Sequence, residues 1–119
     1  MNLHNPLFAP DNLICPAVDI FDAEKTWEEL DAAFFAAKDG RQIRAATVRY
    51  LLQARKAGNE TIAKAFEQNP FAASRVTRSY AYLADCIVET AFKVATKKLH
   101  RLSNATDAER LAVLAVGGS

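Results

Sequence analysis

Proline and glycine are scarce in this sequence, and their positions are informative. The 119 residues contain four of each, and three of the prolines lie within the first 16 residues. Neither residue occurs between positions 72 and 102. Because proline and glycine are the residues that most often interrupt regular structure, their absence predicts one long helix in this segment.

Cysteine, histidine and long apolar runs are also rare. Cys15 and Cys86 are far apart without metal-type spacing, which predicts two reduced thiols. His4 and His100 have no neighbouring ligand residues, so no metal site is expected. No apolar run approaches the roughly 20 residues of a membrane span, and the N-terminus has no secretory pattern. We therefore expect a soluble, cytoplasmic protein with no membrane contact.

The net charge of +1 conceals an uneven distribution. Residues 1–40 carry a net charge of −6 and residues 41–119 carry +7. We expect an acidic first helix to lie against basic later ones, with long-range attraction between them. The alternative is a basic face for an acidic partner or a nucleotide. Nucleic acid is not an expected ligand, because acidic residues dilute the basic ones.

The hydrophobic pattern predicts an all-α fold. Residues 1–20 are expected to form an extended arm whose apolar side chains dock on the rest of the domain. Residues 21–105 are expected to form a bundle of about four helices, because apolar residues recur there at three- and four-residue steps. The predicted helices span residues 22–40, 41–57, 60–68 and 72–102.

Local signals mark the ends of these helices. Asp22 is a favourable N-cap for the first helix, and Gly40 is a C-cap signal at its end. Gly58 is expected to stop the second helix, and Asn69-Pro70 to break the third. The single Trp27 is expected to pack between helices.

The fourth predicted helix carries two apolar stripes. One comprises Val76, Tyr80, Leu83, Ile87, Ala91 and Val94; the other comprises Ala81, Ala84, Val88, Phe92, Ala95, Leu99 and Leu102. A helix that is apolar over so wide an arc must be covered from more than one side. We therefore expect it to be the central helix of the bundle.

Charged residues on this helix suggest two further features. Its last turns contain Lys93, Lys97, Lys98 and Arg101, which complement the helix dipole and are also candidate contacts for a phosphate or a partner. Asp85 and Glu89, four residues apart, are a candidate carboxylate pair, although pairing with Arg78, Lys93 or other bases is the favoured interpretation. No complete catalytic set is present, so no catalytic residue is predicted.

The C-terminal residues combine a capping-box pattern with an apolar run. Thr106-Asp107-Ala108-Glu109 matches the capping box, and Leu111–Val116 leads directly into Gly117-Gly118. The run is compatible with a short helix or with a buried strand. No other stretch of the sequence reads as a strand with which it could pair, so in these 119 residues alone we expect a helix or disorder. An apolar strand that ends in two glycines is typical of sites where backbone N–H groups approach a phosphate.

These C-terminal residues carry a family resemblance. The stretch 78–119, with the sequences LHRLSNAT and AERLAVLAVGG at its end, resembles the N-terminal region of the bifunctional PII uridylyltransferase/uridylyl-removing enzymes. The resemblance implies that residues 106–119 begin an incomplete nucleotidyltransferase domain. It also implies that Gly117, Gly118 and Ser119 form part of a nucleotide site, although the family often has tyrosine where Ser119 stands.

The resemblance also implies the chemistry of a larger enzyme. Such an enzyme transfers UMP from UTP to a tyrosine of the PII signalling protein, removes it through an HD-type hydrolase domain, and senses glutamine through ACT domains. The Asp-x-Asp pair that binds Mg²⁺ or Mn²⁺ would follow Ser119. Because nucleotidyl transfer depends on such metal ions, the 119 residues alone are expected to be inactive.

A second interpretation is a free-standing helical interaction module. Leu111–Val116 would then be an exposed docking segment for a partner or for a second copy of the chain. The codons that follow Ser119 discriminate between the two interpretations. Continuation into Gly-Arg-Gly-Glu and Asp-x-Asp indicates the enzyme, whereas a stop codon indicates the module.

Overall fold

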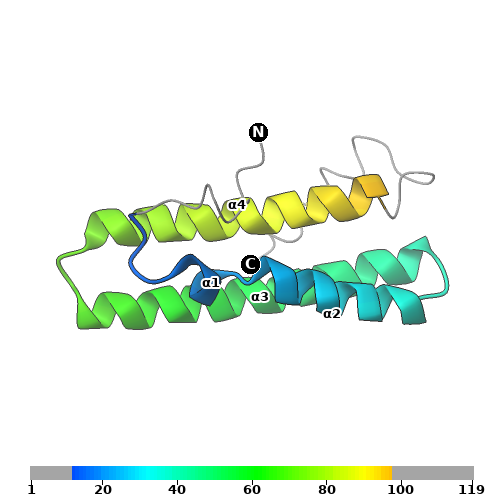
Figure 1. The fold of residues 1–119 in the computed structure, drawn as a ribbon, viewed down its shortest axis with the longest axis horizontal. Coiled ribbons are helices and arrows are strands. Elements are labelled where there is room, and N and C mark those ends of the chain that lie inside the picture. Colours follow the sequence, from blue (N-terminus) through cyan, green and yellow to red (C-terminus); the bar gives the residue numbers. More distant parts are fainter. Residues whose placement is uncertain (1–11, 98–119) are drawn as a thin grey trace.

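The computed structural model describes residues 12–97, and these residues form helices joined by short connections. A single turn, α1 (Ala17–Ile20), precedes three long helices, α2 (Ala23–Ala36), α3 (Gly40–Gln68) and α4 (Ala73–Lys97) (Figure 1). The all-α prediction is confirmed for this part of the chain. The predicted number of long helices is wrong, because residues 41–57 and 60–68 belong to one continuous helix.

Gly58 lies inside α3 rather than at a helix end, which corrects the prediction that it stops the second helix. It is buried, and a Cβ atom at this position would lie 2.7 Å from Cδ2 of Leu83 and 2.8 Å from the carbonyl oxygen of Ile20. Glycine costs about 1 kcal/mol relative to alanine within a helix. Here glycine lets α1 and α4 approach α3 closely, and the resulting packing offsets that cost.

Side-chain caps define where α2 and α3 begin. The Asp22 carboxylate accepts a hydrogen bond from the Lys25 backbone N–H at 3.0 Å, which confirms the predicted N-cap. The Gly40 prediction is wrong, because α2 ends at Ala36 and Gly40 is the first residue of α3. Asp39 caps α3 by accepting from Gln42 N–H, while Gln42 Oε1 accepts from Lys38 N–H. This reciprocal arrangement resembles a capping box.

The central helix is α3, not the predicted segment 72–102. The elements α1, α2 and α4 each pack on α3, and α2 and α4 both run antiparallel to it (Figure 1). α3 ends at Gln68, as the Asn69-Pro70 pair predicts. Its 29 residues make it about 43 Å long. This length lets the N-terminal half contact α2 while the C-terminal half contacts α1.

Only one of the two predicted stripes of α4 is mainly buried. Leu83, Ile87, Ala91 and Val94 of the first stripe lie in the core, whereas Tyr80 is 40% exposed. In the second stripe Ala95 is buried, but Val88 is 40% and Phe92 is 55% exposed, and Ala81 is exposed as well. The expectation that α4 is covered on both sides is therefore wrong for Ala81, Val88 and Phe92, while Leu99 and Leu102 of this stripe lie outside the described residues.

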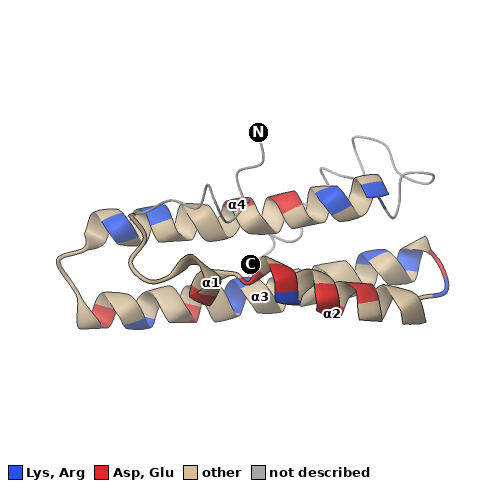
Figure 2. Cartoon of the chain, viewed as in Figure 1, with Lys and Arg blue, Asp and Glu red and all other residues tan. Residues whose placement is uncertain are grey.

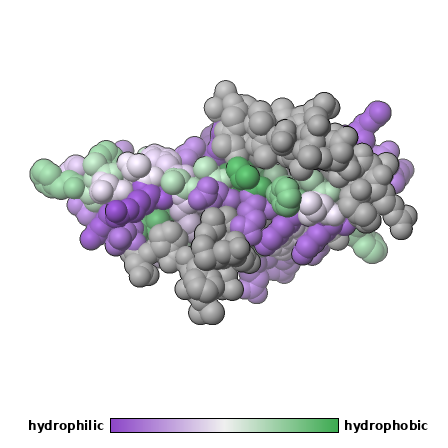
Figure 3. Space-filling view, turned by 90° about the horizontal axis from the view of Figure 1, so that it is seen from above, coloured by the Kyte–Doolittle hydropathy of each residue, from purple (hydrophilic) through white to green (hydrophobic). Residues whose placement is uncertain are grey.

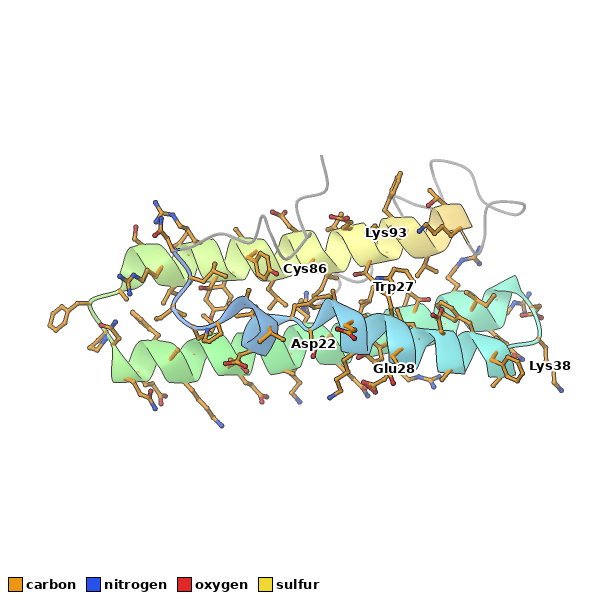
Figure 4. The ribbon with its side chains drawn as sticks, in the orientation of Figure 1. Asp22, Trp27, Glu28, Lys38, Cys86 and Lys93 are labelled. Carbon is orange, nitrogen blue, oxygen red and sulfur yellow. The ribbon has the colours of Figure 1, made fainter. Side chains whose placement is uncertain are left out.

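The core lies where α1, α2 and α4 meet α3. Its largest fully buried side chains come from all three long helices: Leu30, Leu51, Ile62, Leu83, Ile87 and Val94. Trp27 is half-buried and packs against this cluster from α2, in agreement with its predicted packing role (Figure 4). Thr47 and Thr90 are buried within the same region, and their hydroxyls donate to Ile43 and Cys86 carbonyls one turn earlier. Local bonding of this kind satisfies buried hydroxyls without a partner helix.

The segment that precedes α1 is anchored on α4 by a buried serine. Ser79 is completely buried, and its Oγ accepts from the Ile14 N–H at 3.0 Å and donates to the Arg75 carbonyl at 2.7 Å. Leu13 and Ile14 pack against the core and Ile20 lies in it, which confirms docking for these residues, whereas docking is wrong for Val18, which is 58% exposed. The arm is not fully extended, because α1 forms a helical turn within it. Residues 1–11 lie outside the described part.

Replacing Ser79 with alanine tests this anchor. The variant leaves the Ile14 N–H without its acceptor, so we expect a loss of about 1–2 kcal/mol in the free energy of unfolding, measured by urea denaturation. Thr77 supplies the control, because its exposed hydroxyl also bonds one turn back, to the Ala73 carbonyl, but holds no other segment. Thr77→Ala is expected to change stability by less than about 0.5 kcal/mol. Equal effects of the two substitutions would contradict the anchoring role.

The acidic and basic helices lie side by side, as the charge pattern predicts. Carboxylates line α2, and the neighbouring N-terminal half of α3 carries Arg41, Arg44 and Arg49 (Figure 2).

None of the helices in residues 12–97 combines the length and hydropathy that a membrane span requires.

Candidate functional site

The predicted basic cluster at the end of α4 is described in part. Lys93 Nζ forms an ion pair with Glu89 Oε1 at 3.0 Å, one turn earlier on the same helix. Lys97 is exposed and lies in the last turn, where the helix dipole favours positive charge. Lys98 and Arg101 lie outside the described residues. The structure thus places two of the four predicted cations, Lys93 (labelled in Figure 4) and Lys97, on this end of α4.

The carboxylate-pair hypothesis gives way to the ion-pair interpretation. Glu89 contacts Lys93, its i+4 neighbour, and Asp85 is exposed on α4. A partly buried surface ion pair at i,i+4 spacing contributes about 1 kcal/mol or less. The pair therefore supplies ordinary surface stabilisation and no acid–base chemistry.

The predicted nucleotide-binding residues Gly117, Gly118 and Ser119 lie outside the described part of the chain. Their assignment stays a prediction. The same holds for the capping-box segment and the apolar run that precede them.

A surface depression of about 270 Å³ lies where the junction of α1 and α2 meets α3. Its polar lining includes Asp22, Lys25 and Tyr50. Two of these groups have structural partners: Asp22 caps α2, and Tyr50 Oη donates to Glu29 Oε1 at 3.1 Å. Burial, followed by contact with Glu29, raises the pKa of the Tyr50 phenol, although a hydrogen bond with Thr26 opposes this shift. The depression therefore holds a neutral phenol rather than a reactive phenolate.

A second depression, of about 360 Å³, lies between the end of α2 and the start of α3. Its lining is mostly alanine and includes only two longer polar side chains: Ala33, Ala36, Ala37, Gln42, Ala45, Ala46 and Arg49. Sequence reasoning did not predict either depression, since each depends on how the helices pack.

The buried thiol of α4 is unreactive at neutral pH. Cys15 and Cys86 are both thiols, as predicted. Burial raises the pKa of Cys86 from 9.0 to about 11, with a further increase from Asp85, and a hydrogen bond from Tyr82 only partly opposes this. Burial also raises the pKa of the Tyr82 phenol, one turn earlier. A thiol that stays protonated is a poor nucleophile.

The Cys86 thiol should make the fold sensitive to alkali. A raised native pKa means that the folded state holds this proton more tightly than the unfolded state does. The corresponding stabilisation is complete below pH 9 and is lost as the pH rises from 9 to about 11. Urea denaturation at intervals across this range should show a steeper fall for the unmodified chain than for Cys86→Ala. Parallel pH profiles would contradict the assignment.

Within residues 12–97, no three His, Cys, Asp or Glu side chains gather as a metal site would require. The described side chains include a basic helix end at Lys97 and an exposed apolar stripe on α4 that contains Val88 and Phe92. Sequence reasoning identifies this stripe but wrongly predicts that it is covered, because apolar periodicity does not show which of two stripes a neighbour packs against.

Comparisons with known proteins are consistent with the resemblance seen in the sequence. The chain is 42% identical over 116 residues to the bifunctional uridylyltransferase/uridylyl-removing enzyme of Cereibacter sphaeroides, and 42% identical over 99 residues to that of Ruegeria pomeroyi. The corresponding enzyme of Erythrobacter litoralis is 31% identical over 99 residues.

No family model matches the chain, and no solved structure matches it significantly. The alignments with the Cereibacter and Ruegeria enzymes cover 96% and 83% of the chain but only 12% and 11% of the relatives' lengths. The chain is therefore homologous, over most of its length, to a small part of bifunctional uridylyltransferase/uridylyl-removing enzymes.

Proposed function

We propose that this chain is the helical N-terminal part of a bifunctional uridylyltransferase/uridylyl-removing enzyme, in which it supports the catalytic domain. The observation that carries the proposal is the 42% identity over 116 residues to an enzyme of that name. A bracing role is supported by the use of Asp22, Asp39 and Ser79 in caps and helix-internal bonds, which hold the helices in place.

The proposed activity belongs to the longer protein. It transfers UMP from UTP to a tyrosine of a PII signalling protein, and a separate hydrolase domain removes the UMP under the control of glutamine. The transferase would use Mg²⁺ or Mn²⁺, held by carboxylates that follow this segment, to neutralise charge on the triphosphate. This nitrogen-regulatory chemistry would take place in the cytoplasm.

In this proposal the C-terminal residues begin the nucleotidyltransferase domain. Leu111–Val116 supplies the first strand, and Gly117 and Gly118 let backbone N–H groups approach the triphosphate of UTP. In this proposal the Ser119 hydroxyl would contact phosphate. Residues 21–105 form the brace.

The gene sequence and a labelling assay test the proposal together. Codons after Ser119 should encode Gly-Arg-Gly-Glu followed by Asp-x-Asp. The longer protein, given labelled UTP, Mg²⁺ and a PII protein, should transfer the label, whereas the 119-residue chain should not. A stop codon directly after Ser119, or transfer by the 119-residue chain alone, would overturn this assignment.

The basic end of α4 gives a kinetic prediction for the longer enzyme. Lys97, Lys98 and Arg101 are proposed to contact UTP or the PII surface, so replacing all three with glutamine should raise the KM for one of these substrates several-fold. Lys93 is left unchanged, because it already pairs with Glu89. Lys56→Gln, an exposed change on α3, is the control. Unchanged kinetics in the triple variant would remove this contact from the proposal.

A free-standing interaction module is the second candidate. Exposed aromatic residues favour it, since Phe35 on α2 is 95% exposed and Phe71 between α3 and α4 is 96% exposed. Such a module should form a complex with a partner or with itself. Sedimentation of the purified chain over a range of concentrations tests self-association.

A further inference from the structure

The second stripe of α4 forms an apolar face that nothing in residues 12–97 covers. Its exposed members are Ala81, Val88 and Phe92, and Ala84 is half-buried beside them. The four positions recur at three- and four-residue steps, so they lie on one side of the helix. Figure 3 views the molecule from the α4 side and shows hydrophobic residues among polar ones. We call these four residues the α4 face.

We propose that the α4 face packs against Leu111–Val116 of the same chain. Each of these six residues is apolar, and removal of their surface from water favours contact with another apolar surface. The exposed Asp85 lies at the edge of this face, four residues after Ala81 and seven before Phe92, so the contact must leave its carboxylate in water. The inference goes beyond the proposed function, because such a contact does not depend on UTP or on catalysis.

Chain length permits this contact. Thirteen residues separate Lys97 from Leu111, and an extended segment of that length reaches about 43 Å. Val88 lies only about 14 Å back along the helix from Lys97. A tether of this length keeps the two surfaces at a high effective concentration, which favours contact within one chain over contact between copies.

The two surfaces also match in size. The distance along α4 from Ala81 to Phe92 is about 16 Å. Six residues of strand span about 20 Å, and a helix over residues 107–116 spans about 15 Å. If the run is a strand, its side chains alternate between two faces, and a buried strand of a parallel sheet needs helices on both. The α4 face would then provide one of those covers, which is how a brace would hold a catalytic sheet.

Photo-crosslinking from Phe92 tests the proposal in the complete 119-residue chain. Phe92→p-benzoylphenylalanine keeps an aromatic side chain at an exposed position, so the fold should tolerate it, and circular dichroism checks this. Trypsin cleaves after Arg110 and releases residues 111–119 as one peptide. We expect irradiation to join this peptide to the α4 peptide within monomeric protein, at several times the yield of Phe71→p-benzoylphenylalanine, a more exposed position between α3 and α4.

A second substitution makes the result specific. Leu114→Asp in the Phe92-labelled chain should abolish the crosslink, because a carboxylate is costly to bury against apolar side chains. Crosslinked dimers would show that a second copy covers the face and would overturn the proposal. Equal yields from Phe92 and Phe71, or no crosslink to residues 111–119, would overturn it too. A stop codon after Ser119 would overturn the proposed function. It would not affect the test of this contact, because the crosslink is measured in the 119-residue chain itself.

Discussion

A leucine-to-alanine change at position 51 is expected to cost about 3 kcal/mol in the free energy of unfolding. Leu51 lies near the middle of α3, is completely buried, and belongs to the cluster where the long helices meet. Truncation removes apolar contact and leaves a cavity that the rigid neighbouring helices fill only in part. For a domain of this size such a loss is a large part of the total stability.

The adjacent residue provides the control. Leu52 has the same chemistry on the same helix but is only partly buried. Urea denaturation followed by circular dichroism should show a smaller loss for Leu52→Ala, with an unchanged dependence on denaturant concentration in both variants. Equal losses would mean that α3 is not the centre of the core.

Gly58→Ala is expected to destabilise the fold by about 2 kcal/mol, although alanine is the better helix former. The added methyl group would lie 2.8 Å from the Ile20 carbonyl oxygen, which belongs to the backbone, and 2.7 Å from Cδ2 of Leu83. The leucine can adjust its rotamer, but relief at Ile20 requires α1 to shift. Overpacking of this kind typically costs 1–3 kcal/mol.

The neighbouring position should show the opposite preference between glycine and alanine. Ala57 is exposed on the same turn, and Ala57→Gly removes helix propensity without changing any close approach. It should cost about 1 kcal/mol, so glycine is disfavoured at position 57 and preferred at position 58. Thermal or urea unfolding of the two variants measures this reversal. A gain in stability from Gly58→Ala would contradict the close packing of α1 on α3.

These residues explain which parts of the fold were predictable from the sequence. Asp22 and Asn69-Pro70 act through local backbone chemistry, so the start of α2 and the end of α3 were predicted correctly. Gly58 acts through packing between segments distant in sequence, which local propensity cannot reveal. Asp39 and Gln42 did carry a capping signal for the start of α3, but Gly40 was interpreted as a helix end instead.

The sequence alone predicts only part of the candidate site. Lys93 and Lys97 follow from the helix pattern, and the Lys93–Glu89 pair follows from their spacing. The glycine pair was recognised only because its sequence resembles a known family, and the structure does not describe it. The exposure of Val88 and Phe92 was missed, because the identity of the covering element depends on the tertiary arrangement.

The position of α3 has a consequence for how the molecule opens. α1, α2 and α4 all rest on this one helix, so its amide protons should exchange with solvent only when the entire unit unfolds. α1, a single turn, should exchange through small local fluctuations. Deuterium uptake should then be slow in α3 and faster in α1. Because α3 is one continuous helix, a rotation at one of its ends would also move the elements packed near the other end.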